Sequence, residues 1–453
     1  MLRAFQGKTR GKDKVLVIGL DGVPCRIIKN FIKMGVMPYM GKLSQQGTMR
    51  EMISSIPPVS SVAWTNFFTG VNPGKHGIYG FMERKPDSYD IYFPNSTHIK
   101  SPTLWDILSK NNKRTIAINI PQTYPAQPLN GMLISGFVAL DLEKGVYPST
   151  IYPKLKKMDY RIDVDYREAA EKKEEFFQDL FYTLDKRKEA ILHFLKGEDW
   201  DLFIATFTGT DRLHHYFWND LADTESPYHL KFLEYYQKLD TIIKKIVSSI
   251  GKEVNLIILA DHGFTLLKKE IYPNTWLKEN GYLKLKKEPP ESLADIDPSS
   301  RAFILDPGRV FINLKGKMPN GCVEAGPEYE ALLKELTREF LKVDGIDKVF
   351  RKDDLYSGSY LEQAPDMVLL SESRYDIKGS LSKENLFGKD RFSGMHTHND
   401  ALFYIRGLNS NREKIYIIDL APTILDFLGL PIPSHMDGVS LIQNTKGDQV
   451  RGS

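Results

Sequence analysis

Short, unbroken hydrophobic runs recur along the chain, with longer amphipathic segments between them. The first run, KVLVIGL, occupies residues 14–20. A run of this length is typical of a strand buried in a parallel sheet, whereas residues 227–251 have hydrophobic positions at the three-to-four spacing of a helix. Further runs lie at 115–120, 132–137, 201–207, 254–260, 366–370 and 401–405, and a further helical segment lies at 171–197.

This alternation of runs and amphipathic segments predicts the fold class. Strands that alternate with helices form a doubly wound, mostly parallel α/β sheet with helices on both faces. In such sheets ligands bind beyond the carboxyl ends of the strands. We therefore expect the chemistry of this protein at that edge.

The region from residue 271 to 391 interrupts the alternation. It begins with a segment rich in charged and turn residues, and continues with a strand-like GRVFINL and the helical segment 328–343. We interpret 271–391 as an inserted cap or lid. The remainder is predicted to form a discontinuous catalytic core with two flexible tails. The core covers 14–270 and 392–445, and the tails cover 1–13 and 446–453.

The composition is that of a globular protein. Of the 453 residues, 42% are hydrophobic and 26% are charged, and the net charge is +3. No cluster of Lys and Arg suggests a nucleic-acid polymer as partner. No secretory signal and no membrane-spanning run is evident, and Cys25 and Cys322 are too few for a disulfide framework. We therefore expect a cytoplasmic protein without a membrane partner; the oligomeric state is not specified.

Acidic residues and histidines follow several of the predicted strands. A single such pair is common at a polar strand exit, but several pairs directed to one sheet edge are typical of a metal site. Asp211 and His215 are four residues apart, so on a helix both side chains would project from one face. The candidates are Asp21, Asp211, His214, His215, Asp261, His262, His396 and His398.

The mixture of carboxylates and imidazoles predicts divalent metal ions. Three aspartates and three histidines are about enough for two ions, for which zinc is favoured and manganese is the alternative. Two metals roughly 3.5–4 Å apart can stabilise the attacking and leaving oxygens of a phosphoryl transfer. The candidate chemistry is therefore metal-dependent phosphoryl transfer.

A pair of serines supplies the candidate nucleophile. Residues 55–81 contain Pro57 and Pro58, then Ser60 and Ser61 at the start of a predicted helix. Phosphate binds well at a helix N-terminus, and a hydroxyl beside a metal becomes a usable nucleophile. The residues alone do not distinguish Ser60 from Ser61.

These motifs resemble the alkaline phosphatase superfamily and, within it, the type I phosphodiesterase/nucleotide pyrophosphatase family. The resemblance spans about residues 14–440 and rests, in chain order, on VIGLDGV, PPVSSVAWTNFFTGVNPGKHGI, TGTDRLHH, LADHGF, GMHTHND and IIDLAPTILDFLGLPIPSHMDG. It implies a two-step hydrolysis through a phosphoserine, with Ser60 as the nucleophile. It also implies one metal held by Asp211, His215 and His396, and another held by Asp21, Asp261 and His262 with Ser60 bridging towards it.

One position departs from the family pattern. Phe81 stands where nucleotide pyrophosphatases have an asparagine that helps to hold the substrate phosphate. Phe81 and His214 are the candidate substrate-binding residues. The resemblance implies a hydrolase of phosphodiester or phosphoanhydride bonds acting on a small phosphorylated substrate, for which a nucleotide is one candidate. The alternatives are a phosphomonoesterase, a phosphonate hydrolase, a phosphomutase, and a homologue that binds metal without catalysis.

Overall fold

The computed structural model describes residues 14–167, 169–408 and 412–442. The two predicted tails, 1–13 and 446–453, lie outside these ranges. Within them, no helix has both the length and the apolar character needed to cross a membrane.

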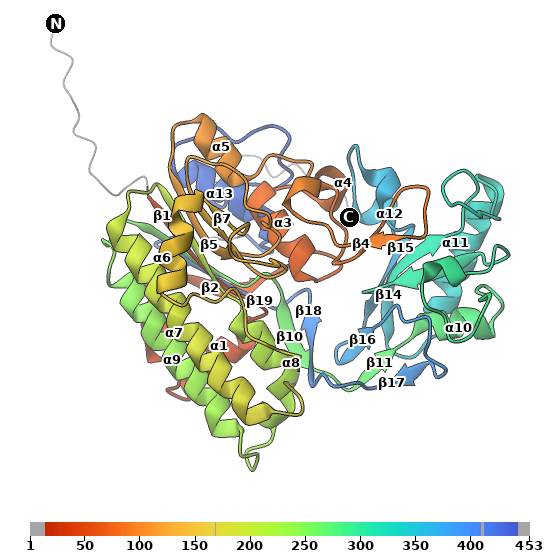
Figure 1. The fold of residues 1–453 in the computed structure, drawn as a ribbon, viewed down its shortest axis with the longest axis horizontal. Coiled ribbons are helices and arrows are strands. Elements are labelled where there is room, and N and C mark those ends of the chain that lie inside the picture. The colour runs from red at the N-terminus through yellow and green to blue at the C-terminus, as the bar shows by residue number, and fades with distance from the viewer. Residues whose placement is uncertain (1–13, 168, 409–411, 443–453) are drawn as a thin grey trace, which may run out of the picture.

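An eight-stranded sheet forms the centre of the larger part of the molecule (Figure 1), in the order β2-β19-β9-β1-β8-β5-β6-β7. The five strands from β9 to β6 in this order are parallel, while β19, an interior strand, and β7 at the edge pair antiparallel with their neighbours. The inner strands are buried on both faces, so their residues are almost all hydrophobic. The bounds are β1 Val15–Leu20, β2 Gly47–Met52, β5 Thr115–Ile120, β6 Gly131–Ser135, β7 Val146–Tyr147, β8 Leu202–Phe207, β9 Asn255–Leu259 and β19 Ala401–Arg406.

Helices lie on both faces of this sheet, which confirms the predicted α/β class (Figure 1). The long helices α7 and α9 pack together with α8 on one side, and α3 and α13 pack together on the other. The bounds are α1 Cys25–Lys33, α2 Pro38–Ser44, α3 Ser60–Thr69, α4 Pro73–His76, α5 Leu104–Lys110, α6 Tyr152–Lys157, α7 Lys173–Gly197, α8 Gly209–Ala222, α9 His229–Val247 and α13 Leu420–Phe427.

A second, four-stranded antiparallel sheet lies on the other side of the molecule (Figure 1). It has a hydrophobic core of its own, formed within residues 271–377 together with Tyr89. The hydrophobic run at 366–370 belongs to this sheet as β15, and not to the main sheet. The bounds are β12 Ala302–Leu305, β13 Arg309–Ile312, β14 Ile346–Arg351, β15 Met367–Ser371, α10 Pro273–Glu279, α11 Pro327–Phe340 and α12 Lys352–Leu355.

Short strands link the two parts. The chain leaves the main sheet after β9 through β10 and returns through β18 to β19, and β10 pairs antiparallel with β18. This ladder lies between the two larger sheets in Figure 1. The remaining bounds are β3 Glu83–Arg84, β4 Ile91–Tyr92, β10 Gly263–Leu266, β11 Lys269–Ile271, β16 Tyr375–Ile377, β17 Phe387–Gly388 and β18 Gly394–Thr397.

Candidate active site

The strand order brings the candidate residues to one edge of the main sheet. β1 lies between its parallel neighbours β8 and β9, so the residues that follow these three strands emerge side by side. Asp21 follows β1, Asp261 and His262 follow β9, and Asp211 lies in the first turn of α8 after β8. Pairing of β10 with β18 brings His396 opposite Phe264. Segments far apart in the sequence thus meet where ligands bind in this fold class.

The first group of candidate ligands consists of Asp211, His215 and His396. The Nε2 atoms of the two histidines are 3.0 Å apart, and Asp211 Oδ1 is 3.5 Å from that of His215 and 3.2 Å from that of His396. His396 Nδ1 lies 2.9 Å from the carbonyl oxygen of Pro58, to which it can donate. That bond would leave Nε2 unprotonated and directed at the other ligand atoms, as metal binding requires.

The second group consists of Asp21, Asp261 and His262. His262 Nε2 is 3.3 Å from Asp261 Oδ2 and 3.8 Å from Asp21 Oδ1, while its Nδ1 faces the carbonyl oxygen of Gly263 at 3.0 Å. The rings of His262 and His396 stack with their centroids 3.7 Å apart, so the two groups are adjacent.

Gly22 fits closely between the two groups. Its backbone N–H donates to Asp261 Oδ1 over 3.0 Å, and its φ of +64° is in the left-handed region. A Cβ at this position would lie 3.2 Å from both Asp211 Oδ1 and the His262 ring. Glycine is therefore favoured by its conformation and by the limited space.

Both groups fit divalent metal ions. Asp211 Oδ1 and Asp261 Oδ2 are buried and form no hydrogen bond, although each lies within 3.5 Å of an imidazole nitrogen. A buried carboxylate oxygen without a hydrogen bond is costly unless a cation contacts it. Mixed carboxylate and imidazole ligands suit zinc, and a more oxygen-rich set also suits manganese.

The pKa values of the three acids, Asp21, Asp211 and Asp261, reflect their burial and the charged groups beside them. Burial, with the nearby charges of Asp261 and Asp211, raises the pKa of Asp21 well above its usual value. Burial likewise raises the pKa of Asp261, to about 6. Burial acts in the same direction on Asp211, but His215, His396 and Arg212 hold the pKa of that carboxyl well below its usual value. A bound cation would favour the ionised form of all three acids.

Two of the histidines, His215 and His262, are held in the neutral form that metal binding needs. Burial lowers the pKa of His215 to about 3 and lowers the pKa of His262 well below its usual range. At neutral pH both rings therefore present an unprotonated nitrogen.

Ser60 is the first residue of α3 and lies against the second ligand group. Its Oγ is 3.2 Å from His262 Nε2 and 3.5 Å from Asp21 Oδ1. The hydroxyl of Ser61 is buried and forms no hydrogen bond. Of the two serines, Ser60 is thus the one that contacts the candidate ligands.

His214 does not face the ligand groups. The ring is fully buried, its Nδ1 lies 2.8 Å from the carbonyl oxygen of Gly22, and its Nε2 lies 2.6 Å from the hydroxyl of Tyr236. With both nitrogens engaged by the protein, the expected contact of His214 with substrate finds no support in its surroundings. Its bond to Gly22 instead suits a positioning role. His398 is absent from both ligand groups.

Phe81 is half-buried and packs beside the start of α3. It contacts the cluster of Val59, Val62 and Ile78, and its ring meets that of Phe137 edge to face at 5.4 Å. It also lines a cavity of about 850 Å³. Contact of Phe81 with the substrate stays a prediction.

Arg212 was not among the residues selected from the sequence. Its Nη1 donates to Asp211 Oδ2 over 3.0 Å, and its Nε and Nη2 donate to Asp163 Oδ2 over 3.0 and 2.8 Å. Arg212 thus orients the carboxylate of a candidate ligand. The only signal for Arg212 in the sequence was its position directly after Asp211. Its other partner, Asp163, gave no signal because it lies in an irregular segment.

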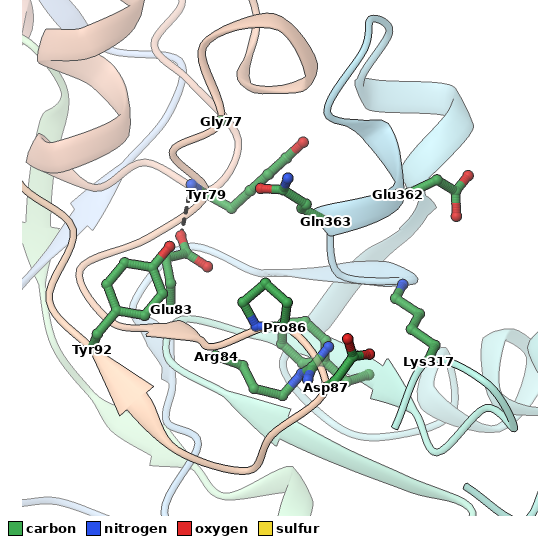
Figure 2. A pocket seen from close by; sticks show the side chains of 11 residues that line it. Gly77, Tyr79, Glu83, Arg84, Pro86, Asp87, Tyr92, Lys317, Glu362 and Gln363 are labelled. Carbon is green, nitrogen blue, oxygen red and sulfur yellow. Dashed lines mark hydrogen bonds between the residues drawn. The ribbon is translucent and has the colours of Figure 1, made fainter. Parts of the chain in front are cut away.

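A smaller cavity of about 120 Å³ lies where the loop after α4 meets the second sheet, and Figure 2 shows its lining. Glu83 accepts a hydrogen bond from the backbone of Tyr79 over 2.8 Å and also pairs with buried Arg309 over 3.1 Å. Lys317 reaches the cavity from the second sheet's side. None of its lining residues belongs to a ligand group, so this cavity is not the candidate active site.

The fold and the residues gathered at the sheet edge define an alkaline phosphatase-like α/β enzyme. The model of the type I phosphodiesterase/nucleotide pyrophosphatase family matches residues 15–399, and the chain belongs to that family. It is therefore a hydrolase that acts on phosphoric ester bonds. No curated protein sequence matches the chain at a significant level.

Solved structures share the fold at low sequence identity. Phosphonoacetate hydrolase from Sinorhizobium meliloti 1021 in complex with phosphonoformate is 15% identical with a TM-score of 0.62, covering 92% of this chain and 95% of that one. Murine ectonucleotide pyrophosphatase/phosphodiesterase 5, as an inactive variant with AMP, is 13% identical with a TM-score of 0.57, covering 93% and 96%. The human protein of the same name is 14% identical with a TM-score of 0.56, covering 94% and 97%.

Proposed function

We propose that this protein is a metal-dependent phosphodiesterase that works through a phosphoserine at Ser60. The observation that carries the proposal is the position of the Ser60 hydroxyl, 3.2 Å from His262 Nε2 and 3.5 Å from Asp21 Oδ1 at the start of α3. A hydroxyl placed among candidate ligands at a helix N-terminus is suited to attack a bound phosphoryl group.

The ligand groups divide the proposed metal site into two halves. Asp211, His215 and His396 would hold one ion, and Asp21, Asp261 and His262 would hold the other. Two divalent ions, with zinc favoured over manganese, would lower the pKa of the serine hydroxyl and neutralise charge that develops on the phosphoryl oxygens.

The chain's own residues carry out the two steps. The Ser60 hydroxyl gives up its proton as Oγ forms a bond to phosphorus and the ester bond to the leaving group breaks, and the leaving oxygen takes up one proton in its place. A water molecule then attacks the phosphoserine, which releases the phosphorylated product and restores the Ser60 hydroxyl. Arg212 keeps the Asp211 carboxylate in place throughout, because it donates to Oδ2 and leaves Oδ1 directed at the histidines.

The nature of the substrate separates this proposal from its rivals. The solved relatives bind phosphonoformate in one case and AMP in another, so the shared fold is compatible with different phosphorus compounds. Phe81 supplies a ring rather than a hydrogen-bond donor beside the nucleophile. A phosphomonoesterase, a phosphonate hydrolase or a phosphomutase would use the same ligand groups on another substrate, whereas a homologue without catalysis would bind metal and turn over none.

The test compares model substrates on protein of measured metal content. We expect hydrolysis of bis-p-nitrophenyl phosphate to exceed that of p-nitrophenyl phosphate, and to disappear when a chelator removes the metal. Phosphonoacetate serves as the third substrate. A preference for the monoester or the phosphonate would overturn the diesterase proposal in favour of that activity, and no turnover of any of them would favour the non-catalytic reading.

A further inference from the structure

The loop that leads into Ser60 contains two consecutive prolines. We call residues 54–59 the serine loop, and Ser60, the first residue of α3, follows it directly. Pro57 and Pro58 have no N–H, so at these two positions the backbone can be held only through its carbonyl oxygens. The donors that reach the carbonyl oxygens of the serine loop therefore help to fix the position of the Ser60 hydroxyl.

Three side chains approach these carbonyl oxygens. Ser55 Oγ donates to the carbonyl oxygen of Pro57 over 2.7 Å, within the loop itself. His396 Nδ1 lies 2.9 Å from the carbonyl oxygen of Pro58, and His396 is already a candidate ligand. The third side chain is Tyr356, whose hydroxyl donates to the carbonyl oxygen of Ile56 over 2.9 Å from a position 300 residues further along the chain.

Tyr356 belongs to the part of the molecule that carries the second sheet. It directly follows α12, near α4 in Figure 1. Tyr356 is buried, its ring meets that of Tyr79 edge to face at 5.3 Å, and the side chain of Ile56 packs against the same cluster. A buried tyrosine hydroxyl needs a hydrogen-bond partner, and the Ile56 carbonyl oxygen is that partner.

Neighbouring bonds hold Tyr356 in place. The N–H of Ser357 donates to Asn72 Oδ1 over 3.0 Å, and the N–H of Tyr360 donates to the carbonyl oxygen of Gly74 over 2.9 Å. A Cβ at Gly74 would lie 2.6 Å from the carbonyl oxygen of Ser357, so the two backbones are in close contact. A side chain that is anchored in this way can hold the serine loop in one position.

We propose that Tyr356 is a positioning residue for the nucleophile: its hydroxyl holds the backbone of Ile56 and thereby aligns Ser60 with the ligand groups. This inference rests on the proposed function. The rate of attack on phosphorus depends on alignment, and a displacement of about 1 Å can lower it by roughly 10²-fold. The role requires no contact between Tyr356 and the substrate.

Two conservative variants separate positioning from packing. Tyr356→Phe keeps the ring against Tyr79 and removes only the hydroxyl that donates to Ile56. Tyr79→Phe is the matched control, because the Tyr79 hydroxyl donates to the carbonyl oxygen of Tyr360 over 2.7 Å in the same cluster. Each variant loses one hydrogen bond between the same two parts of the molecule, so a general loss of packing should affect both alike.

The kinetic test uses metal-loaded proteins and bis-p-nitrophenyl phosphate. Tyr356→Phe should lower kcat by roughly 10- to 100-fold and change KM by less than about twofold, because alignment is lost while the ligand groups remain. Its metal content should equal that of wild type. Tyr79→Phe should lower kcat by less than about threefold. An equal loss of kcat in both variants, or loss of metal from Tyr356→Phe, would overturn the inference.

Amide hydrogen exchange examines the serine loop without turnover. The N–H of Val59 donates to the carbonyl oxygen of Pro57 over 3.0 Å, so its exchange reports on the order of the loop. We expect exchange at Val59 to be at least about fivefold faster in Tyr356→Phe than in wild type, and unchanged in Tyr79→Phe. Unchanged exchange in Tyr356→Phe would show that its hydroxyl does not hold the loop, and the inference would be wrong.

Failure of this inference can be told apart from failure of the proposed function. If wild-type protein hydrolyses bis-p-nitrophenyl phosphate through Ser60, but Tyr356→Phe and Tyr79→Phe match in kcat and in exchange at Val59, the inference alone is contradicted. If wild-type protein turns over none of the model substrates, the proposed function is contradicted. Faster exchange in Tyr356→Phe alone would then still support Tyr356 as the residue that holds the serine loop.

Discussion

The two ligand groups at the sheet edge differ in burial and in charge. In one group Asp21, Asp261 and His262 are all buried and supply two carboxylates. In the other, Asp211 supplies the only carboxylate, and the side chains of His215 and His396 are 15% and 19% exposed. Two buried carboxylates are unfavourable without a cation, so the first group depends more strongly on a bound ion than the second.

The residues that support the two groups differ as well. We call Asp21, Asp261 and His262 the buried group, and Asp211, His215 and His396 the half-buried group. The Ser60 hydroxyl contacts His262 and Asp21 of the buried group, whereas Arg212 donates a hydrogen bond to Asp211 of the half-buried group. The half-buried group thus has a permanent positive charge beside it, and the buried group has the candidate nucleophile. In the proposed mechanism the group of Asp21, Asp261 and His262 therefore lies nearest to the attacking hydroxyl.

The strongest test of this comparison is removal of the nucleophile. Ser60→Ala should lower kcat on bis-p-nitrophenyl phosphate by roughly 10³-fold or more, because no hydroxyl remains to form the phosphoserine. Metal content, measured on the same samples, should be largely retained. Ser61→Ala is the control and should change kcat by less than about tenfold, since its hydroxyl forms no hydrogen bond. Full activity of Ser60→Ala would move the attack to Ser61 or to water.

The second test removes one ligand from each group. Asp261→Asn should release the ion of the buried group, and His396→Gln should release that of the half-buried group, so each variant should retain about one ion less than wild type. Activity should fall by roughly 10²-fold in both, because the two ions act together. Elemental analysis of the purified variants measures the ion content. Loss of both ions from either variant would show that the groups do not bind independently.

The third test uses pH on the metal-free protein. Burial raises the pKa of Asp261 from 3.8 to about 6, so the folded protein holds a proton there that the unfolded chain releases. The stability that this proton contributes is present below pH 4 and is lost as pH rises through about 6. Asp261→Asn avoids that loss and should be stabilising relative to wild type, by up to about 3 kcal/mol near pH 7.

Urea denaturation in chelator at pH 5 and pH 7 measures this difference. The stabilisation by Asp261→Asn should be larger at pH 7 than at pH 5, and it should reverse sign when metal is restored, because the variant lacks a ligand. Asp199→Asn serves as the surface control, since the Asp199 side chain is 98% exposed. An equal effect at both pH values would mean that Asp261 is not the acid destabilised by burial.

Much of the fold could be predicted because each inner strand carries its own signal. The runs at 14–20, 201–207 and 254–260 became β1, β8 and β9, three neighbours that are buried on both faces. β2, Gly47–Met52, escaped prediction because it is an edge strand with few buried residues. The run at 366–370 was recognised as a strand, but nothing in its residues indicated that it would join the second sheet.

The residues of the candidate site could be predicted only where they follow a recognisable hydrophobic strand. Asp21, Asp211 and Asp261 stand next to recognisable strands, and parallel strands end at one edge. Asp163, which fixes Arg212, lies in an irregular segment with no pattern. His214 looked like a candidate for substrate contact, but packing of α8 against α9 places its Nε2 against Tyr236 instead.

The sequence by itself determined the fold class, the family and the kinds of residue available for chemistry, because hydrophobic periodicity and local motifs are properties of neighbouring residues. Only the tertiary structure decided how those residues combine. The contact of Ser60 with His262, the pairing of His396 with His215, and the cavity lined by Phe81 and Tyr166 each join segments more than 80 residues apart. Such contacts depend on strand order and loop packing, which no single stretch of the chain encodes.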